Sequence, residues 1–129
     1  MFESLDFVYT PTEDVDATAR RYVEELGATL EWKVRGMGTV VACLRLAQDG
    51  PAILLTDHVE GVQPIFVYRV ADYLTAVEAL RAAGIEGLRE LEIPHGPLAS
   101  FIAPGGQRLG VYELTRPGAA GMFDGRFDD

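Results

Sequence analysis

The sequence has 129 residues, which is enough for one ordinary domain and too short for two. About 48% of the residues are hydrophobic and 24% are charged, as is typical of a folded globular protein. Eleven Lys and Arg residues against twenty Asp and Glu residues give a formal charge of −9. This balance argues against nucleic acid as a partner, because phosphate binding needs clustered positive charge. The same acidic excess would attract cationic ligands.

Cysteine content and hydropathy indicate a cytoplasmic protein. The one cysteine, Cys43, excludes an internal disulfide, and its apolar neighbours predict a buried, inert thiol. The first residues do not resemble a signal peptide, and no apolar run approaches the roughly 18 residues that a membrane span needs. We therefore expect no membrane partner.

The beginning of the chain predicts a strand followed by an amphipathic helix. The strand-like segment is Leu5 to Tyr9, and Pro11 ends it. Asp14 is a plausible N-cap of the helix, and Gly27 is its C-terminal stop. One apolar stripe, at spacings of three and four residues, is formed by Val15, Ala19, Tyr22, Val23 and Leu26.

Three further strands are predicted next, at residues 30–35, 39–46 and 52–56, with glycine-containing turns between them. In the first of these strands Leu30, Trp32 and Val34 alternate with charged residues, so we expect one apolar and one solvated face. Trp32 lies on the apolar side. It is interpreted either as core packing or as a stacking platform for a ligand.

The same order of elements then restarts. Phe66-Val67-Tyr68 repeats the tripeptide Phe7-Val8-Tyr9, and Asp72 and Gly84 delimit a second helix. Three more strands are expected around residues 88–93, 98–103 and 109–114. The chain therefore reads as one domain made of two βαβββ units, at about residues 4–57 and 63–115, with a tail over residues 116–129.

Paired βαβββ units and the hairpin Ala103-Pro104-Gly105-Gly106-Gln107 resemble the vicinal oxygen chelate superfamily. This group includes glyoxalase I, extradiol dioxygenases, methylmalonyl-CoA epimerase and the bleomycin-resistance proteins. The hairpin is similar to the family's Asp-Pro-Asp-Gly-Asn turn, with Ala103 and Gly105 in place of the two acids. The resemblance implies an α+β fold in which the two units form a curved mixed sheet around a cleft, with the helices on the outer face.

Enzymes of this superfamily hold a divalent metal with four strand residues, usually His, Gln or Glu. By position, the resemblance places these four sites on Phe7, Leu54, Ile65 and Gly110. None of the four side chains carries a donor atom, so we expect no metal and no other cofactor. Asp6 beside Phe7 could bind a metal, but strand alternation would point it to the opposite face.

Without metal donors, the chain resembles the superfamily's binders more than its enzymes. The bleomycin-resistance proteins are similar in length, acidic balance and aromatic cleft, and they are dimers that sequester a cationic drug. The resemblance therefore implies a homodimer that binds an aromatic, cationic small molecule, as in antibiotic resistance. The residues expected to bind the ligand are Phe7, Tyr9, Trp32, Leu54, Phe101 and Tyr112.

Other readings stay open. A metal-free lyase, isomerase or other glyoxalase-like enzyme could use His95 or an acidic residue for proton transfer, because histidine titrates near neutrality. We expect His95 on a loop near the cleft mouth and His58 exposed between the two units. A third reading is a scaffold whose own aromatic side chains fill the cleft.

The tail over residues 118–129 is expected to be a frayed end. Alternatively, Phe123, Phe127 and the acidic residues of this tail would cover a cleft, such as that of a partner subunit.

Overall fold

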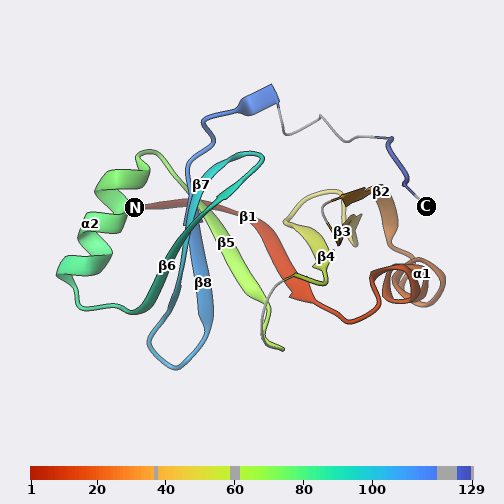
Figure 1. Cartoon of the computed structure of the whole chain (residues 1–129), viewed down its shortest axis with the longest axis horizontal. Coiled ribbons are helices and arrows are strands. Elements are labelled where there is room, and N and C mark those ends of the chain that lie inside the picture. The colour runs from red at the N-terminus through yellow and green to blue at the C-terminus, as the bar shows by residue number, and fades with distance from the viewer. Residues whose placement is uncertain (37, 59–61, 119–124, 129) are drawn as a thin grey trace.

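A computed structural model describes residues 1–36, 38–58, 62–118 and 125–128. A strand, a helix and three strands follow one another twice in the chain (Figure 1). The first unit contains β1 (Phe2–Pro11), α1 (Val15–Leu26), β2 (Thr29–Gly36), β3 (Thr39–Arg45) and β4 (Ala52–Thr56). The second contains β5 (Ile65–Val70), α2 (Tyr73–Ala82), β6 (Glu86–Ile93), β7 (Gly96–Ile102) and β8 (Arg108–Tyr112).

The described strands form one eight-stranded sheet in the order β2-β3-β4-β1-β5-β8-β7-β6. β1 pairs with β4, and β5 with β8, in parallel, whereas the other neighbouring strands are antiparallel. The antiparallel pair of β1 and β5 joins the two units, with Phe7 opposite Val67. The α+β fold with a curved mixed sheet, expected from the resemblance, is confirmed.

Side chains near the ends of the helices determine where they begin and end. Asp14 and Asp72 are the N-caps, and their carboxylates accept hydrogen bonds from the amides of Ala17 at 3.0 Å and Thr75 at 2.9 Å. Gly27 ends α1 in the left-handed conformation, as the sequence predicts. Neither helix in the described part of the chain is long and apolar enough to span a membrane.

Among the described residues, buried apolar side chains form three clusters, and two of these lie between the helices and the outer face of the sheet. Val15 and Ala19 of α1 pack on β3 and β4, whereas Val77 and Leu80 of α2 pack on β7 and β8. Two of the five residues in the stripe predicted for α1 are buried, Val15 and Ala19. Val23 and Leu26 are 40% and 61% exposed.

The third cluster lies on the opposite side of the sheet, called the inner face here. It consists of Tyr9, Trp32, Cys43, Ala52, Leu54, Val67, Ile93, Leu98 and Tyr112, with partly buried neighbours that include Phe7 and Ile65. The burial predicted for Cys43 is confirmed, because only 4% of the residue is exposed. The inner face therefore carries the aromatic side chains that the sequence singled out in β1, β2 and β8.

The expectation of a single apolar face on β2 is wrong because the strand contains a β-bulge. Leu30 pairs with Leu44 and Trp32 pairs with Cys43, so the intervening residue is extra in the pairing with β3. One extra residue reverses the alternation of side chains. Leu30 consequently packs under α1, while Trp32 belongs to the inner face.

Residues 125–128 are not frayed, contrary to the expectation for the tail. They lie beside β2, where the Lys33 amide donates to the Arg126 carbonyl at 2.8 Å and the Asp128 amide donates to the Lys33 carbonyl at 2.8 Å (Figure 1). Phe127 is 54% exposed. The other aromatic residue of the tail, Phe123, lies outside the described residues. This segment covers the edge of the sheet and lines no described pocket.

Candidate functional site

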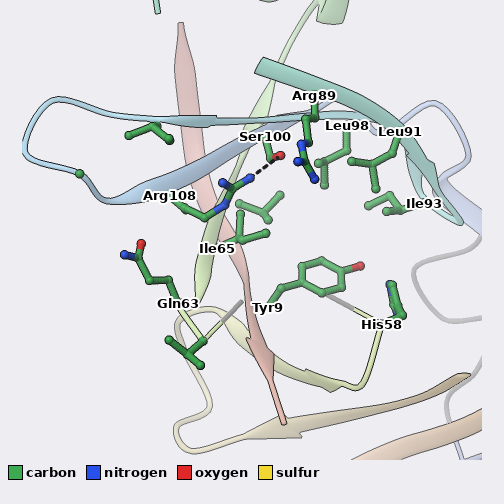
Figure 2. Close-up of a pocket in the computed structure, with 14 residues that line it drawn as sticks. Tyr9, His58, Gln63, Ile65, Arg89, Leu91, Ile93, Leu98, Ser100 and Arg108 are labelled. Atoms are coloured by element: carbon green, nitrogen blue, oxygen red, sulfur yellow. Dashed lines mark hydrogen bonds between the residues drawn. The ribbon is translucent and has the colours of Figure 1, made fainter. Parts of the chain in front are cut away.

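The inner face of the second unit contains a cavity of about 710 Å³. Strands β5 to β8 provide most of its wall, Tyr9 extends into it from β1, and His58 and Gln63 line it from the segment between the units (Figure 2). Its apolar surface comes mainly from Ile65, Val67, Leu91, Ile93, Leu98 and Ile102. A volume of this size is typical of ligand-binding clefts.

Two arginines and a serine form the polar wall of the cavity. Arg89 on β6 is the cross-strand neighbour of Ser100 on β7, and Arg108 on β8 donates from Nη2 to Ser100 Oγ at 3.1 Å. In Figure 2 these three side chains lie together on one side of the cavity, and Tyr9 and His58 lie on the other. None of the described lining residues is an aspartate or a glutamate. The charged side chains among the described lining residues are therefore arginines, although the whole chain is acidic.

Tyr9 provides a neutral hydroxyl group to the cavity. Burial raises the pKa of this phenol far above its usual value, and Cys43 and Tyr112 raise it further. Its side chain is consequently protonated throughout the physiological range and can donate a hydrogen bond to a bound molecule.

Asp6 lies on the inner face, so the expectation from strand alternation is wrong at this residue. In the pairing of β1 with β5, Leu5 is opposite Tyr68 and Phe7 is opposite Val67, which leaves Asp6 as the extra residue of a bulge. Its carboxylate accepts hydrogen bonds from Ser4 Oγ at 2.6 Å, Arg69 Nε at 3.1 Å and Tyr112 Oη at 2.5 Å.

The two titratable partners in this cluster have opposite protonation states. Burial raises the pKa of Asp6, but the hydrogen bonds from Ser4, Tyr112 and Arg69 outweigh it and hold the pKa below its usual value. Burial, followed by the hydrogen bond to Asp6, raises the pKa of Tyr112. Asp6 is therefore an anion, and Tyr112 a neutral donor, at neutral pH.

His95 lies on the loop before β7, where the sequence placed it, and it is buried there, with 6% of its surface exposed. It belongs to the tight turn between β6 and β7, and its ring centroid lies 4.9 Å from that of Phe7 and 6.3 Å from that of Tyr112. Burial lowers the pKa of the imidazole and Arg116 lowers it further, although Asp6 opposes both. The Nδ1 atom is buried and has no hydrogen-bond partner among the described residues. This places a neutral imidazole at the end of the inner face.

No protein-family model matches the sequence, and no curated protein matches it. Solved structures do match. Methylmalonyl-CoA epimerase from Mycobacterium tuberculosis superposes with a TM-score of 0.72 and 20% identity, over 92% of this chain and 93% of the epimerase. A variant of the Streptomyces coelicolor methylmalonyl-CoA epimerase, in complex with 2-nitronate-propionyl-CoA, superposes with a TM-score of 0.69 and 15% identity, over 90% of this chain and 97% of the epimerase. A hypothetical protein from Bacillus halodurans superposes with a TM-score of 0.67 and 14% identity, over 85% of this chain and 93% of that protein.

The chain has the vicinal oxygen chelate fold. At identities of 14 to 20% these likenesses establish the architecture, and the activity has to be argued from the site itself.

The metal of vicinal oxygen chelate enzymes does not fit the residues of this chain. Phe7, Leu54 and Ile65 belong to the inner-face cluster or pack against it, and Gly110 lies between Arg108 and Tyr112, where an added Cβ would contact Ile65 and Val67. None of the four has a side-chain oxygen, imidazole or thiolate. The described part of the chain also contains no group of three or more His, Cys, Asp and Glu side chains placed to hold an ion.

Of the six residues expected to bind a ligand, Tyr9 lines the cavity. The inner-face cluster beside it includes Phe7, Trp32, Leu54 and Tyr112, of which the last two are 1% exposed. Phe101 packs under α2 on the outer face, away from the cavity, because it alternates with Ser100 along β7. His58 is exposed, as expected, and hydrogen-bonds through Nδ1 to Thr56 Oγ1 at the cavity wall.

Sequence reasoning missed the polar wall of the cavity. Arg108 is two residues before Gly110, so its place on the inner face was available from strand alternation. The pairing of β6 with β7, which brings Arg89 beside Ser100, was not available without the fold.

Proposed function

We propose that this chain binds a small organic molecule in the inner-face cavity without using a metal. The observation that carries the proposal is the cavity of about 710 Å³, with a mainly apolar lining and a few converging polar groups, on the face where the fold's metal donors are replaced by Phe7, Leu54, Ile65 and Gly110. Such a site gains affinity from apolar burial and orientation from its polar groups.

The charge around the cavity argues against the cationic drug expected from the overall composition. Net charge describes the whole surface, whereas a bound molecule experiences the field of the groups nearest to it. Those groups include Arg89 and Arg108. The nearby acid on the inner face, Asp6, is paired with Arg69. Sequestration of a bleomycin-type cation is thus supported less well than binding of a neutral or anionic molecule, and the homodimer stays a prediction.

Blocking the cavity is expected to abolish this binding. Ile65→Trp adds a large ring to the cavity wall, so a ligand panel should no longer raise the midpoint of thermal unfolding. For the unblocked protein, a ligand at about 100 times its Kd adds roughly 2.7 kcal/mol, which raises the midpoint by several degrees. The panel contains bleomycin, neutral aromatic compounds, fatty carboxylates and acyl-CoA thioesters.

The matched control is Leu74→Trp, which adds the same ring to an exposed position on α2. It should keep the shifts of the unmodified protein. Shifts of equal size in Ile65→Trp would show that the molecule binds elsewhere, and no shift with any compound would count against the proposal.

A second candidate function is a metal-free enzyme in which His95 accepts a proton from the substrate. A specific observation favours it: a neutral imidazole with a buried, unpartnered Nδ1 stands against Phe7, the position of the fold's first metal donor. Two of the three structural neighbours named above support it too, because they are methylmalonyl-CoA epimerases. His95 does not itself line the cavity, so the substrate would have to reach the end of the inner face.

Deuterium exchange tests this candidate. In D₂O, proton abstraction by His95 is expected to replace the α-proton of an acyl-CoA thioester such as methylmalonyl-CoA with deuterium from the solvent. Proton NMR follows the loss of the α-proton signal. His95→Gln should slow the exchange by a factor of about 100 or more, the usual contribution of a general base. The control Arg20→Gln changes an exposed side chain of α1, away from the cavity, and should leave the rate unchanged. Equal rates in both variants would exclude His95 as the base.

A further inference from the structure

The two arginines of the cavity converge on one buried serine. Arg89, Ser100 and Gly110 are consecutive cross-strand neighbours on β6, β7 and β8, and Arg108 is the next residue of β8 on the same face. Ser100 is 3% exposed and accepts the hydrogen bond from Arg108 at 3.1 Å. Figure 2 shows both guanidinium groups directed toward Ser100 from either side. Three donor groups thus meet at one place on the wall.

The charge of Arg108 is not neutralised by the residues that the structure describes. Arg108 forms no ion pair with any residue that the structure describes, and its guanidinium donates a hydrogen bond to a neutral hydroxyl, that of Ser100. A second guanidinium in the same wall raises the electrostatic potential further, and the apolar surroundings reduce its screening. A bound anion would relieve this repulsion. Guanidinium forks match the geometry of carboxylates and phosphates.

The rest of the cavity suits an apolar body attached to that anion. Ile65, Leu98 and Ile93 provide the wall beside the arginines, and the rim carries Leu91, which is 44% exposed. Burying a hydrocarbon chain against such side chains removes apolar surface from water and thereby stabilises a complex. The neutral phenol of Tyr9 lies across the cavity from the arginines (Figure 2). The cavity therefore combines a wall that carries arginines with an apolar wall, which suits an amphipathic ligand.

We propose that Arg89, Ser100 and Arg108 form an oxyanion subsite that binds the carboxylate or phosphate group of an amphipathic ligand, whose apolar part lies against Ile65 and Leu98. The inference rests on the proposed function, because it concerns the same cavity, and it adds the chemical class of the ligand. It also reverses the sign of the ligand charge that the acidic composition suggests.

Four probes with the same eight-carbon chain test the subsite: octanoate, octyl phosphate, octanol and octylammonium. Isothermal titration of the purified chain measures each Kd below the concentration at which the probe forms micelles. One of the two anions is expected to bind at least 10-fold more tightly than octanol, and octylammonium more weakly than octanol. The preferred anion identifies the head group as carboxylate or phosphate.

Charge-matched variants separate the subsite from general attraction. Arg108→Gln and Arg89→Gln should each weaken binding of the preferred anion at least 10-fold and leave the Kd of octanol unchanged. Arg20→Gln removes the same charge from the exposed surface of α1 and should leave both values unchanged. The unchanged octanol Kd also shows that each variant is folded.

The failures of the two proposals are distinguishable. Equal affinities for octanol and both anions, or equal losses in Arg20→Gln and Arg108→Gln, would overturn the oxyanion subsite while leaving the cavity as a binding site. If no probe binds and Ile65→Trp changes nothing across the wider ligand panel, both proposals are overturned.

Discussion

Gly96→Ala is expected to destabilise the protein by about 3 kcal/mol or more, because a side chain has no room at this position. A Cβ atom there would overlap the carbonyl oxygen of Glu113 and lie 2.9 Å from Thr115 Oγ1. Chemical unfolding in urea, followed by circular dichroism, measures the loss. Gly36→Ala is the control, because a Cβ on Gly36 meets no atom within 4 Å, and its effect should stay within about 0.5 kcal/mol.

The clash at Gly96 cannot be relieved by a small shift, because the turn before it is anchored from several sides. Arg116 donates from Nε to the Pro94 carbonyl and from Nη2 to the Ile93 carbonyl, both at 2.8 Å. The amides of Thr115 and Arg116 each donate to the His95 carbonyl at 3.1 Å. A loss below about 1 kcal/mol in Gly96→Ala would mean that the turn, and with it the His95 ring, is held less tightly than these contacts imply.

The fold was predictable because its signals are local and occur twice. Asp14 and Asp72 cap helices through hydrogen bonds that depend on their own neighbours in sequence, and both caps are found where the sequence placed them. The buried face of α2 also follows its three- and four-residue spacing. The stripe predicted for α1 includes Val23 and Leu26, which are largely exposed, because periodicity shows which face is apolar and not how much of that face is covered.

The site was less predictable because it depends on single-residue insertions and on strand pairing. The bulge at Asp6 brings an acid to the inner face, and the bulge after Leu30 moves that residue to the outer face. A bulge leaves the residue types unchanged, so alternation read from the sequence carries no sign of it. The two arginines of the cavity wall, Arg89 on β6 and Arg108 on β8, come together because both strands pair with β7. The sequence alone does not show this pairing.

Asp6→Asn is expected to remove part of the acid sensitivity of the protein. The pKa of Asp6 is lower in the folded chain than its ordinary value of 3.8. A carboxylate of this kind contributes stability above its unfolded pKa, and the contribution is lost as the pH falls through the folded pKa. The unmodified protein should therefore lose stability from about pH 4 downward more steeply than Asp6→Asn, as followed by urea unfolding at a series of pH values.

At pH 7 the same substitution should cost about 1 to 3 kcal/mol, because it removes the charge that faces Arg69 and weakens the hydrogen bond from Tyr112. Tyr112→Phe keeps the buried ring and removes one donor to the carboxylate. It should lower the free energy of unfolding by about 1 kcal/mol at pH 7 and make the loss of stability below about pH 4 less steep. Glu24→Gln, on the exposed side of α1, is the control and should give a profile parallel to the unmodified protein.

The dependence of stability on pH below about 4 also bears on the chemistry of the inner face. A carboxylate held by Ser4, Arg69 and Tyr112 has its lone pairs engaged and its pKa depressed, which makes it a poor proton acceptor. That leaves His95 as the better candidate for a base on this face. If Asp6→Asn and the unmodified protein have parallel acid profiles, the carboxylate is not held in this way, and proton transfer by Asp6 would have to be tested beside proton transfer by His95.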